Sequence, residues 1–194
     1  MTPIPAPSFT RLALVLGLLS AVGPIAIDMY MPGLPVIAAD LGTDVGAAQQ
    51  TLVAFLLALA VGQPLFGPLA DSYGRRRPLI GGLVLFIAAG IGCVFAPDIE
   101  TLVALRFVQG FGICAAAVIV RAVIRDLYTG ARAAQLLALT FLLLGISPLL
   151  APLAGSFFIA YLSWQSIFWV TALVGLLGLI LVIFTLPETL PPER

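Results

Sequence analysis

The chain alternates long apolar runs with short charged segments. Uncharged stretches extend from Val45 to Ala70 and from Pro78 to Pro97, and three consecutive arginines lie between them. Each stretch is long enough to cross a hydrocarbon core about 30 Å thick, because a helix rises about 1.5 Å per residue. The pattern therefore predicts membrane-spanning helices over about residues 48–70 and 78–96, joined by a tight turn.

The remaining apolar runs predict four further spanning helices. We expect a first helix over about residues 12–32 and a fourth over about 101–125. The uncharged segment 133–187 is too long for one helix, and the break at Tyr161-Leu-Ser-Trp-Gln165 divides it into a fifth and a sixth. The expected domains are a cytoplasmic lead (1–11), a six-helix bundle (12–186) and a polar cytoplasmic end (187–194). Pro32, Pro35, Asp40 and Asp44 form the first outer loop in this prediction.

The basic residues predict the orientation of this bundle. If both termini are cytoplasmic, every basic residue except Arg106 falls in an inner segment, and the outer loops contain none. Cytoplasmic loops of membrane proteins carry an excess of positive charge. We therefore expect both ends of a multi-pass chain inside, with the inner charges at Arg11, Arg75, Arg76, Arg77, Arg121, Arg125, Arg132 and Arg194.

Composition excludes several classes of protein. Hydrophobic residues make up 61% of the chain and charged residues 9%, against about 45–50% and 25% in soluble domains. The net charge is zero, and no basic tail indicates nucleic-acid binding. We expect no enzyme, cofactor or metal, because the chain has no His, no nucleotide-binding glycine loop and no cluster of metal ligands. Cys93 and Cys114 lie in apolar runs and are expected to be packing residues.

Two charged residues lie inside predicted spans, at matching depths near the outer ends of the first and fourth helices: Asp28 and Arg106. A charge at the centre of a span costs about 2.5–3.5 kcal/mol on insertion scales, and such residues usually face a bundle interior or a wet cavity. One interpretation is a static ion pair that fastens the two helices together. The interpretation that we favour places Asp28 in a water-filled cavity, where it exchanges a proton for a substrate cation while Arg106 biases its pKa. Without His, a carboxylate must handle protons near neutral pH.

The turn between the second and third helices has the order Gly67-Pro-Leu-Ala-Asp71-Ser-Tyr-Gly74-Arg75-Arg76-Arg77. This segment resembles the helix 2–3 loop motif of the major facilitator superfamily of transporters, although Ser72 stands where the family usually has a basic residue. Gly74 permits a tight turn. We expect Asp71, the arginines and Asp126 to form a charge cluster that latches the cytoplasmic face. The alternative is that the arginines only set topology and contact anionic lipid.

Three further motifs extend the resemblance along the chain. Ile27-Asp-Met-Tyr-Met-Pro-Gly-Leu-Pro35 is similar to the helix 1 signature of the Bcr/CflA branch of drug:proton antiporters. Leu105-Arg-Phe-Val-Gln-Gly110 is similar to the helix 4 motif that the family links to proton coupling, and Gly145-Ile-Ser-Pro-Leu-Leu-Ala-Pro-Leu-Ala-Gly155 resembles the helix 5 antiporter motif. The resemblance implies the roles of the following residues: Asp28 and Arg106 as the coupling pair, Gln109 and Gly110 as supports of the arginine, and Tyr30 and Gln109 as lining of the substrate cavity.

The helix 5 motif also predicts a packing surface. Ser147, Ala151 and Gly155 recur at every fourth residue and form a smooth face that another helix can approach closely. Pro148 and Pro152 each remove a backbone donor and bend the helix. The resemblance implies that this face meets the other half of the transporter, whereas the alternative is that these are ordinary small residues of a membrane helix.

The resemblance implies an all-α membrane protein whose six helices form two inverted three-helix repeats, the N-terminal half of a twelve-helix fold. Such a transporter needs two bundles around a central site, so we expect a second six-helix half: a C-terminal half, a partner chain or a homodimer. The implied function is proton-coupled efflux of small lipophilic or cationic compounds across a bacterial inner membrane, with protons, a small-molecule substrate and the lipid bilayer as partners. Two alternatives are a carrier of another small metabolite and a truncated, non-transporting membrane protein. Ser20 stands where related antiporters have a second acidic residue, which leaves a second protonation site open.

Overall fold

A computed structural model describes residues 8–190, and within that range the chain forms helices and no strand. Six helical segments in the described range are long and apolar enough to span a membrane, as the sequence predicts. The first comprises α1 (Phe9–Asp28) and its continuation, and the others are α3 (Val45–Tyr73), α4 (Arg76–Val94), α5 (Ile99–Leu127), α6 (Gly130–Tyr161) and α7 (Gln165–Thr185).

The first span departs from the prediction at its C-terminal end. Helix α1 ends at Asp28, and the chain continues through a short 3-10 helix, η1 (Met31–Gly33), and helix α2 (Leu34–Asp40). The predicted end of the first helix near residue 32 is therefore wrong, and two short helical segments lie where the first outer loop was predicted to begin. Pro32 and Pro35 each lie in the first turn of a short helix, where a missing N–H breaks no helical hydrogen bond.

Side-chain caps mark the starts of two long helices. The Asp44 carboxylate accepts a hydrogen bond from the Ala47 N–H at 2.9 Å at the start of α3. Asp98 accepts from the Thr101 N–H at 2.7 Å at the start of α5, and hydrogen bonding to Thr101 lowers the pKa of Asp98. Both residues satisfy amides that have no partner inside the helix, so these acidic residues end the turns before α3 and α5 and begin the two spans.

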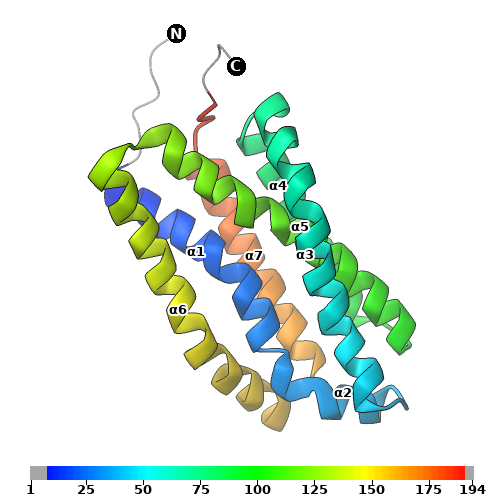
Figure 1. Ribbon diagram of the computed structural model, residues 1–194. Coiled ribbons are helices and arrows are strands. Elements are labelled where there is room, and N and C mark those ends of the chain that lie inside the picture. The colour runs from blue at the N-terminus through cyan, green and yellow to red at the C-terminus, as the bar shows by residue number, and fades with distance from the viewer. Residues whose placement is uncertain (1–7, 191–194) are drawn as a thin grey trace.

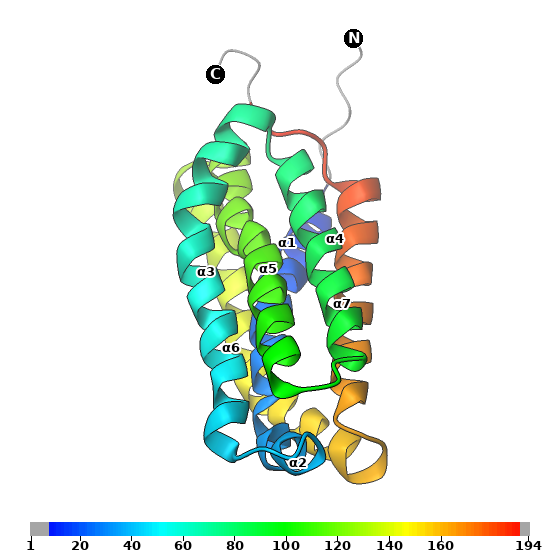
Figure 2. The same cartoon turned by 90° about the vertical axis from the view of Figure 1, so that its right-hand side faces the viewer.

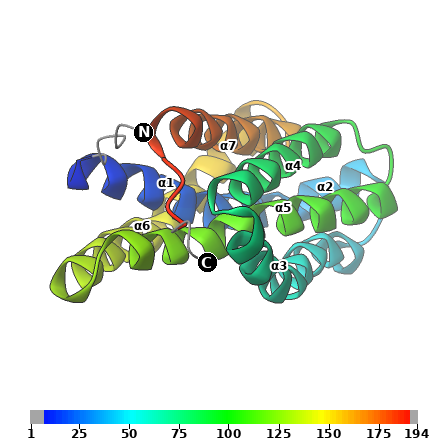
Figure 3. The same ribbon diagram turned by 90° about the horizontal axis from the view of Figure 1, so that it is seen from above.

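The spanning helices are arranged with α1 and α5 in the middle (Figures 1 and 3). Helices α4 and α7 lie on one side of this pair, and α3 and α6 lie on the other (Figures 2 and 3). Helix α5 packs mainly against α3 and α4, whereas α1 packs mainly against α6 and α7. The first helix of each three-span repeat therefore packs against the second and third spans of the other repeat, as in an inverted-repeat transporter bundle.

Glycines allow α5 to approach both of its neighbours closely. A side chain at Gly110 would collide with the backbone of Phe55 on α3, and one at Gly112 would collide with the backbone of Phe86 on α4. Small residues of this kind let membrane helices pack backbone against backbone. Helix α5 is thereby fixed at the centre of the bundle, and it carries the buried arginine of the site described next.

Candidate functional site

Arg106 lies in a cluster of aromatic rings. Its side chain is 1% exposed, and its guanidinium carbon lies 4.3 Å from the ring centroid of Phe55, 4.5 Å from that of Tyr30 and 5.7 Å from that of Phe168. The negative faces of aromatic rings attract a cation, and the attraction is stronger when the cation is removed from water. The rings therefore offset part of the cost of burying this charge.

Arg106 also caps the end of α1. Its Nη2 donates to the backbone oxygen of Ala26 at 3.4 Å, and its Nη1 donates to Oε1 of Gln109 at 2.7 Å. In a continuous helix the Ala26 oxygen would accept from the Tyr30 N–H, but that N–H donates to Ile27 at 3.2 Å instead. The open carbonyl and the negative end of the helix dipole both favour a cation at this point.

Asp28 faces α6 and not Arg106. The Ser147 hydroxyl donates to Oδ2 of Asp28 at 3.4 Å, and the two ion pairs found within residues 8–190 both belong to Arg75. The expectation that Asp28 and Arg106 meet is therefore wrong for the described residues. Arg106 contacts α1 at Ala26. Asp28 lies two positions later, about 200° around the helix from Ala26, so its side chain projects from roughly the opposite face.

Tyr30 and Gln109, which the resemblance places in a substrate cavity, are both fully buried. The Tyr30 hydroxyl lies 2.8 Å from Oγ1 of Thr51. Thr51 uses its only hydrogen to donate to Ala48 at 2.6 Å, so Tyr30 is the donor of the pair. The cavity-lining expectation is wrong for both residues in this structure. They hold the arginine, because Tyr30 faces its guanidinium and Gln109 accepts its hydrogen bond.

The small-residue face of the helix 5 motif packs inside the bundle. Ser147, Ala151 and Gly155 are buried, and a side chain at Gly155 would collide with the backbone of Met29 at the end of α1. The implied contact of this face with another half is therefore wrong. Gly145 and Pro148 are exposed on α6, and Pro152 is partly buried.

A cavity of about 270 Å³ lies between α1, α5 and α6, with α3 at its edge. Its lining is mainly apolar, and Arg121 is the charged residue among the described lining side chains. Arg121 lies inside α5, within the helix predicted over about 101–125 and at the start of the basic inner segment expected from the sequence. A larger apolar groove of about 610 Å³ lies between α1, α6 and α7 and includes Ser147.

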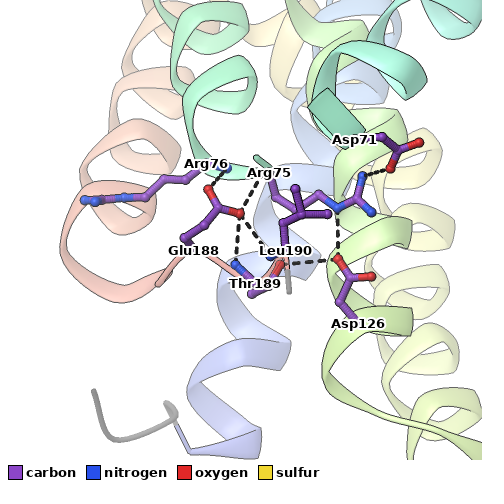
Figure 4. Close-up of polar contacts among 7 residues, drawn as sticks. All are labelled: Asp71, Arg75, Arg76, Asp126, Glu188, Thr189 and Leu190. Atoms are coloured by element: carbon purple, nitrogen blue, oxygen red, sulfur yellow. Dashed lines mark hydrogen bonds and ion pairs between the residues drawn. The ribbon is translucent and has the colours of Figure 1, made fainter. Parts of the chain in front are cut away.

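A cluster of charged side chains lies at the opposite end of α5 from its Asp98 cap (Figure 4). Arg75, which is 5% exposed, pairs with Asp71 at 2.5 Å and with Asp126 at 2.9 Å. Burial acts to lower the pKa of Arg75, but the hydrogen bonds with Asp126 and Asp71 outweigh burial and raise the pKa. The structure thus brings together three residues of the predicted cluster, from α3, the turn and α5.

The other residues of the loop motif differ in their contacts. Arg76 donates from Nη2 to the backbone oxygen of Ile183 on α7 at 2.7 Å, whereas Arg77 is exposed. Gly74 has a φ of 86°, which favours glycine, and a side chain there would also meet the Glu188 carboxylate. Gly67 lies within α3 and has no neighbouring atom within 4 Å of its missing side chain.

Glu188 is a member of the cluster that sequence reasoning missed. Its carboxylate accepts from the backbone N–H groups of Arg75 at 2.7 Å and Arg76 at 3.1 Å, and also from Thr189 at 3.0 Å and Leu190 at 3.1 Å (Figure 4). Burial acts to raise the pKa of Glu188, but these backbone hydrogen bonds outweigh burial and lower the pKa. A carboxylate at the start of α4 satisfies unpaired amides and interacts favourably with the helix dipole. The signal was an acidic residue just after the last span, at the end where the arginines gather.

Comparison with known proteins gives consistent results. The model of the family described as Major Facilitator Superfamily matches residues 16–194. The chain is 39% identical to the uncharacterized MFS-type transporter YdgK of Bacillus subtilis, covering 94% of this chain and 46% of that protein. It is 36% identical to the bicyclomycin resistance protein homolog of Haemophilus influenzae (93% and 46% covered) and 37% identical to the multidrug resistance protein MdtL of Escherichia coli (87% and 43% covered). The chain thus spans about half the length of the curated relatives it matches.

Two solved structures share the fold. The inward open xylose transporter XylE of E. coli matches with a TM-score of 0.79 at 20% identity, covering 94% of this chain and 49% of that protein. The human organic anion transporter MFSD10 matches with a TM-score of 0.74 at 18% identity, covering 97% and 50%. At these identities the likeness establishes the arrangement of the helices, which is that of half a transporter of this kind.

Proposed function

Because this chain belongs to the major facilitator superfamily, we propose that it is the N-terminal six-helix half of a drug:proton antiporter of the Bcr/CflA branch. In this proposal it exports small lipophilic or cationic compounds across a bacterial inner membrane in exchange for protons, with both ends of the bundle in the cytoplasm. Two of the similar proteins are named for resistance, one to bicyclomycin and one to multiple drugs. These names support efflux over uptake of a metabolite.

The observation that carries the proposal is the position of Asp28. This carboxylate lies where the first span breaks, between α1 and α6, and its partner there is the buried hydroxyl of Ser147. An ionisable residue within a membrane-spanning bundle is expensive to place and usually functional. With no His in the sequence, a carboxylate is the group suited to proton exchange near neutral pH.

Asp28 carries the proton in this mechanism, and Arg106 is a positioning residue. An ionised Asp28 only accepts the Ser147 hydrogen, whereas a protonated Asp28 can also donate. The contact between α1 and α6 therefore differs between the two protonation states. Arg106 stays charged at every physiological pH, and its bond to Ala26 holds the end of α1 in place.

A second six-helix half completes the transporter in this proposal, supplied by a C-terminal half, a partner chain or a second copy. Helices α3 and α6 flank the middle pair on one side of the bundle (Figure 3), and both expose large apolar side chains, including Leu56, Leu57, Leu149, Leu150 and Leu153. The cavity between α1, α5 and α6 is then one wall of the substrate site. The cluster around Arg75 serves as a latch on the cytoplasmic side.

Inside-out membrane vesicles test the coupling. We expect that substrates such as bicyclomycin release protons in vesicles containing the chain with the C-terminal half of the Haemophilus influenzae relative, and that Asp28→Asn abolishes this release while the protein remains inserted. Glu100→Gln is the matched control, because Glu100 is an exposed carboxylate in the first turn of α5. Its release should equal that of the wild type.

The same vesicles separate the alternatives. Proton release retained in the Asp28→Asn variant would show that another group carries the proton. Release with the chain alone would indicate a homodimer, and release only with the second half would indicate a partner bundle. No release in either case would favour a non-transporting membrane protein.

A further inference from the structure

We propose that the cavity between α1, α5 and α6 recognises amphipathic anions, and that Arg121 binds their acidic group. The suitable ligand has an apolar body that carries a carboxylate, a sulfonate or a similar group. This inference rests on the proposed transport function and changes the substrate charge expected from the sequence, from cation to anion. The names of the resistance relatives leave that charge open.

The charge on the described part of the cavity wall is positive only. Among the described lining residues Arg121 is the only charged one, and no carboxylate lines the cavity. Asp28 is not part of the wall, although its neighbours Pro24 and Ile27 are. A ligand cation entering this cavity would lose water without gaining an ionic partner, whereas an anion would gain one.

Two hydroxyl groups in the wall do not alter this balance. Ser20 donates its hydrogen to the Leu16 oxygen at 2.8 Å, and Thr140 donates to the Leu137 oxygen at 2.7 Å. Each hydroxyl therefore offers only lone pairs to the cavity. They match an O–H or N–H group on the ligand body and carry no formal charge, so Arg121 determines the sign of the preferred ligand.

The guanidinium of Arg121 is fixed by a hydrogen bond from Nε, and its two terminal nitrogens are available to a ligand. Its Nε donates to the Ala117 oxygen one turn earlier, at 2.9 Å, and the hydrogen bonds found within residues 8–190 involve neither of its terminal nitrogens. A planar guanidinium with two available N–H groups binds carboxylates and similar anions through two parallel hydrogen bonds.

The position of Arg121 along α5 distinguishes it from a charge that only sets topology. Helix α5 extends to Leu127, so Arg121 lies about 9 Å along the axis from that end, at about 1.5 Å per residue. Arg125 is nearer the end; both arginines are exposed, but Arg121 lines the cavity and Arg125 does not. A charge that only sets topology needs no place in a cavity wall, and Arg125 has none there.

An anionic substrate also changes the energetics of exchange. Exchange of a monovalent cation for one proton moves no net charge across the membrane. Export of a monovalent anion against entry of one proton moves two charges in the same sense, so an interior-negative membrane potential drives the export. Recognition of anions would therefore couple efflux to the potential as well as to the proton gradient.

Equilibrium dialysis of the full chain in nanodiscs tests the inference, with naphthalene-2-sulfonate and trimethyl(2-naphthyl)ammonium as probes. The probes share an apolar body, differ in the sign of a permanent charge, and are corrected for uptake by empty nanodiscs. We expect the wild type to bind the sulfonate more tightly. Arg121→Gln should lower sulfonate affinity about tenfold, the effect of one charge-assisted hydrogen bond, and leave ammonium binding unchanged. Arg125→Gln should change neither affinity.

A second variant separates failure of the inference from failure of the proposed function. Ala117→Phe places a ring in the cavity and should abolish sulfonate binding. Equal or tighter binding of the ammonium probe by the wild type, or full sulfonate affinity in Arg121→Gln, would overturn the anion preference and leave transport intact. Binding of neither probe, or binding that persists in Ala117→Phe, would overturn the cavity as the recognition site, and the proton-release assay would decide the proposed function separately. Size-exclusion profiles check that each variant is folded.

Discussion

Two arginines in this bundle are almost equally buried and are compensated in different ways. Arg75, in the turn between α3 and α4, is paired with two carboxylates, Asp71 and Asp126. Arg106 has no carboxylate within ion-pair distance in the described chain and is surrounded by aromatic rings, a glutamine and the end of a helix. The difference shows that a buried cation in this protein can be stabilised by fixed dipoles and rings, which leaves the nearby carboxylate Asp28 available for another role.

The Arg75 and Arg106 sites should also respond differently to salt and to pH. Ion pairs close to water weaken as salt screens them, and they respond to protonation of their carboxylates. Cation–π contacts and bonds to backbone oxygens respond to neither. The Arg106 site is therefore suited to remain constant while protons come and go, and the Arg75 site is suited to change.

Removal of the buried guanidinium should have the largest effect on stability. Arg106→Ala loses the contacts with three rings and leaves Gln109 and the Ala26 oxygen without a partner. We expect the free energy of unfolding to fall by about 2–4 kcal/mol, measured by chemical unfolding in detergent. Arg125→Ala, an exposed position on the same helix, should change stability by less than about 0.5 kcal/mol. Unchanged stability in Arg106→Ala would mean that the rings do no more than balance the desolvation of the charge.

The salt response of the two sites should differ. A double-mutant cycle of Arg75→Gln and Asp126→Asn should give a coupling of about 1–3 kcal/mol at low salt that shrinks in 1 M NaCl. The corresponding cycle of Arg106→Gln and Phe55→Leu should give about 0.5–2 kcal/mol at both salt concentrations. Parallel weakening of both couplings would contradict the distinction between the sites.

Acid should loosen the start of α4 through Glu188, with the smallest of the three effects. The folded pKa of Glu188 is lowered, so its contribution is fully present above the ordinary value of about 4.3 and is lost as pH falls through the lowered value. We expect Glu188→Gln to cost about 0.5–1 kcal/mol near pH 7 and almost nothing in strong acid. Hydrogen exchange of the Arg75 and Arg76 amides reports this difference. Glu100→Gln is the control. A difference between Glu188→Gln and the wild type that persists in acid would show that the ionised Glu188 carboxylate is not its cause.

Much of the fold could be predicted because the membrane imposes length and charge on each span. Uncharged runs separated by arginines determine where helices cross, and the break at Tyr161–Gln165 separates α6 from α7. The C-terminal end of the first span could not be predicted in this way. Pro32 and Pro35 suit a loop or the start of a helix equally well, and the structure has two short helical segments there.

The contacts of the site residues were harder to predict from the sequence than the spans. Position along a span predicts depth, and Arg106 does reach α1 within two residues of Asp28. Depth does not predict which side of the helix faces which neighbour, so the expected pairing was wrong. The spacing of Ser147, Ala151 and Gly155 likewise predicted a face for close packing but not its partner, which is α1. Glu188 was missed because one carboxylate in a polar segment gives no periodic signal.

The contact of Glu188 with the start of α4 has a consequence for motion. One carboxylate, from the segment that follows the sixth span, holds two amides at the beginning of the third. This noncovalent cross-link joins the two repeats at the end of the bundle that holds Arg75. A tilt of either repeat at that surface would carry the other along, so the six spans would swing as a rigid body instead of shearing past one another.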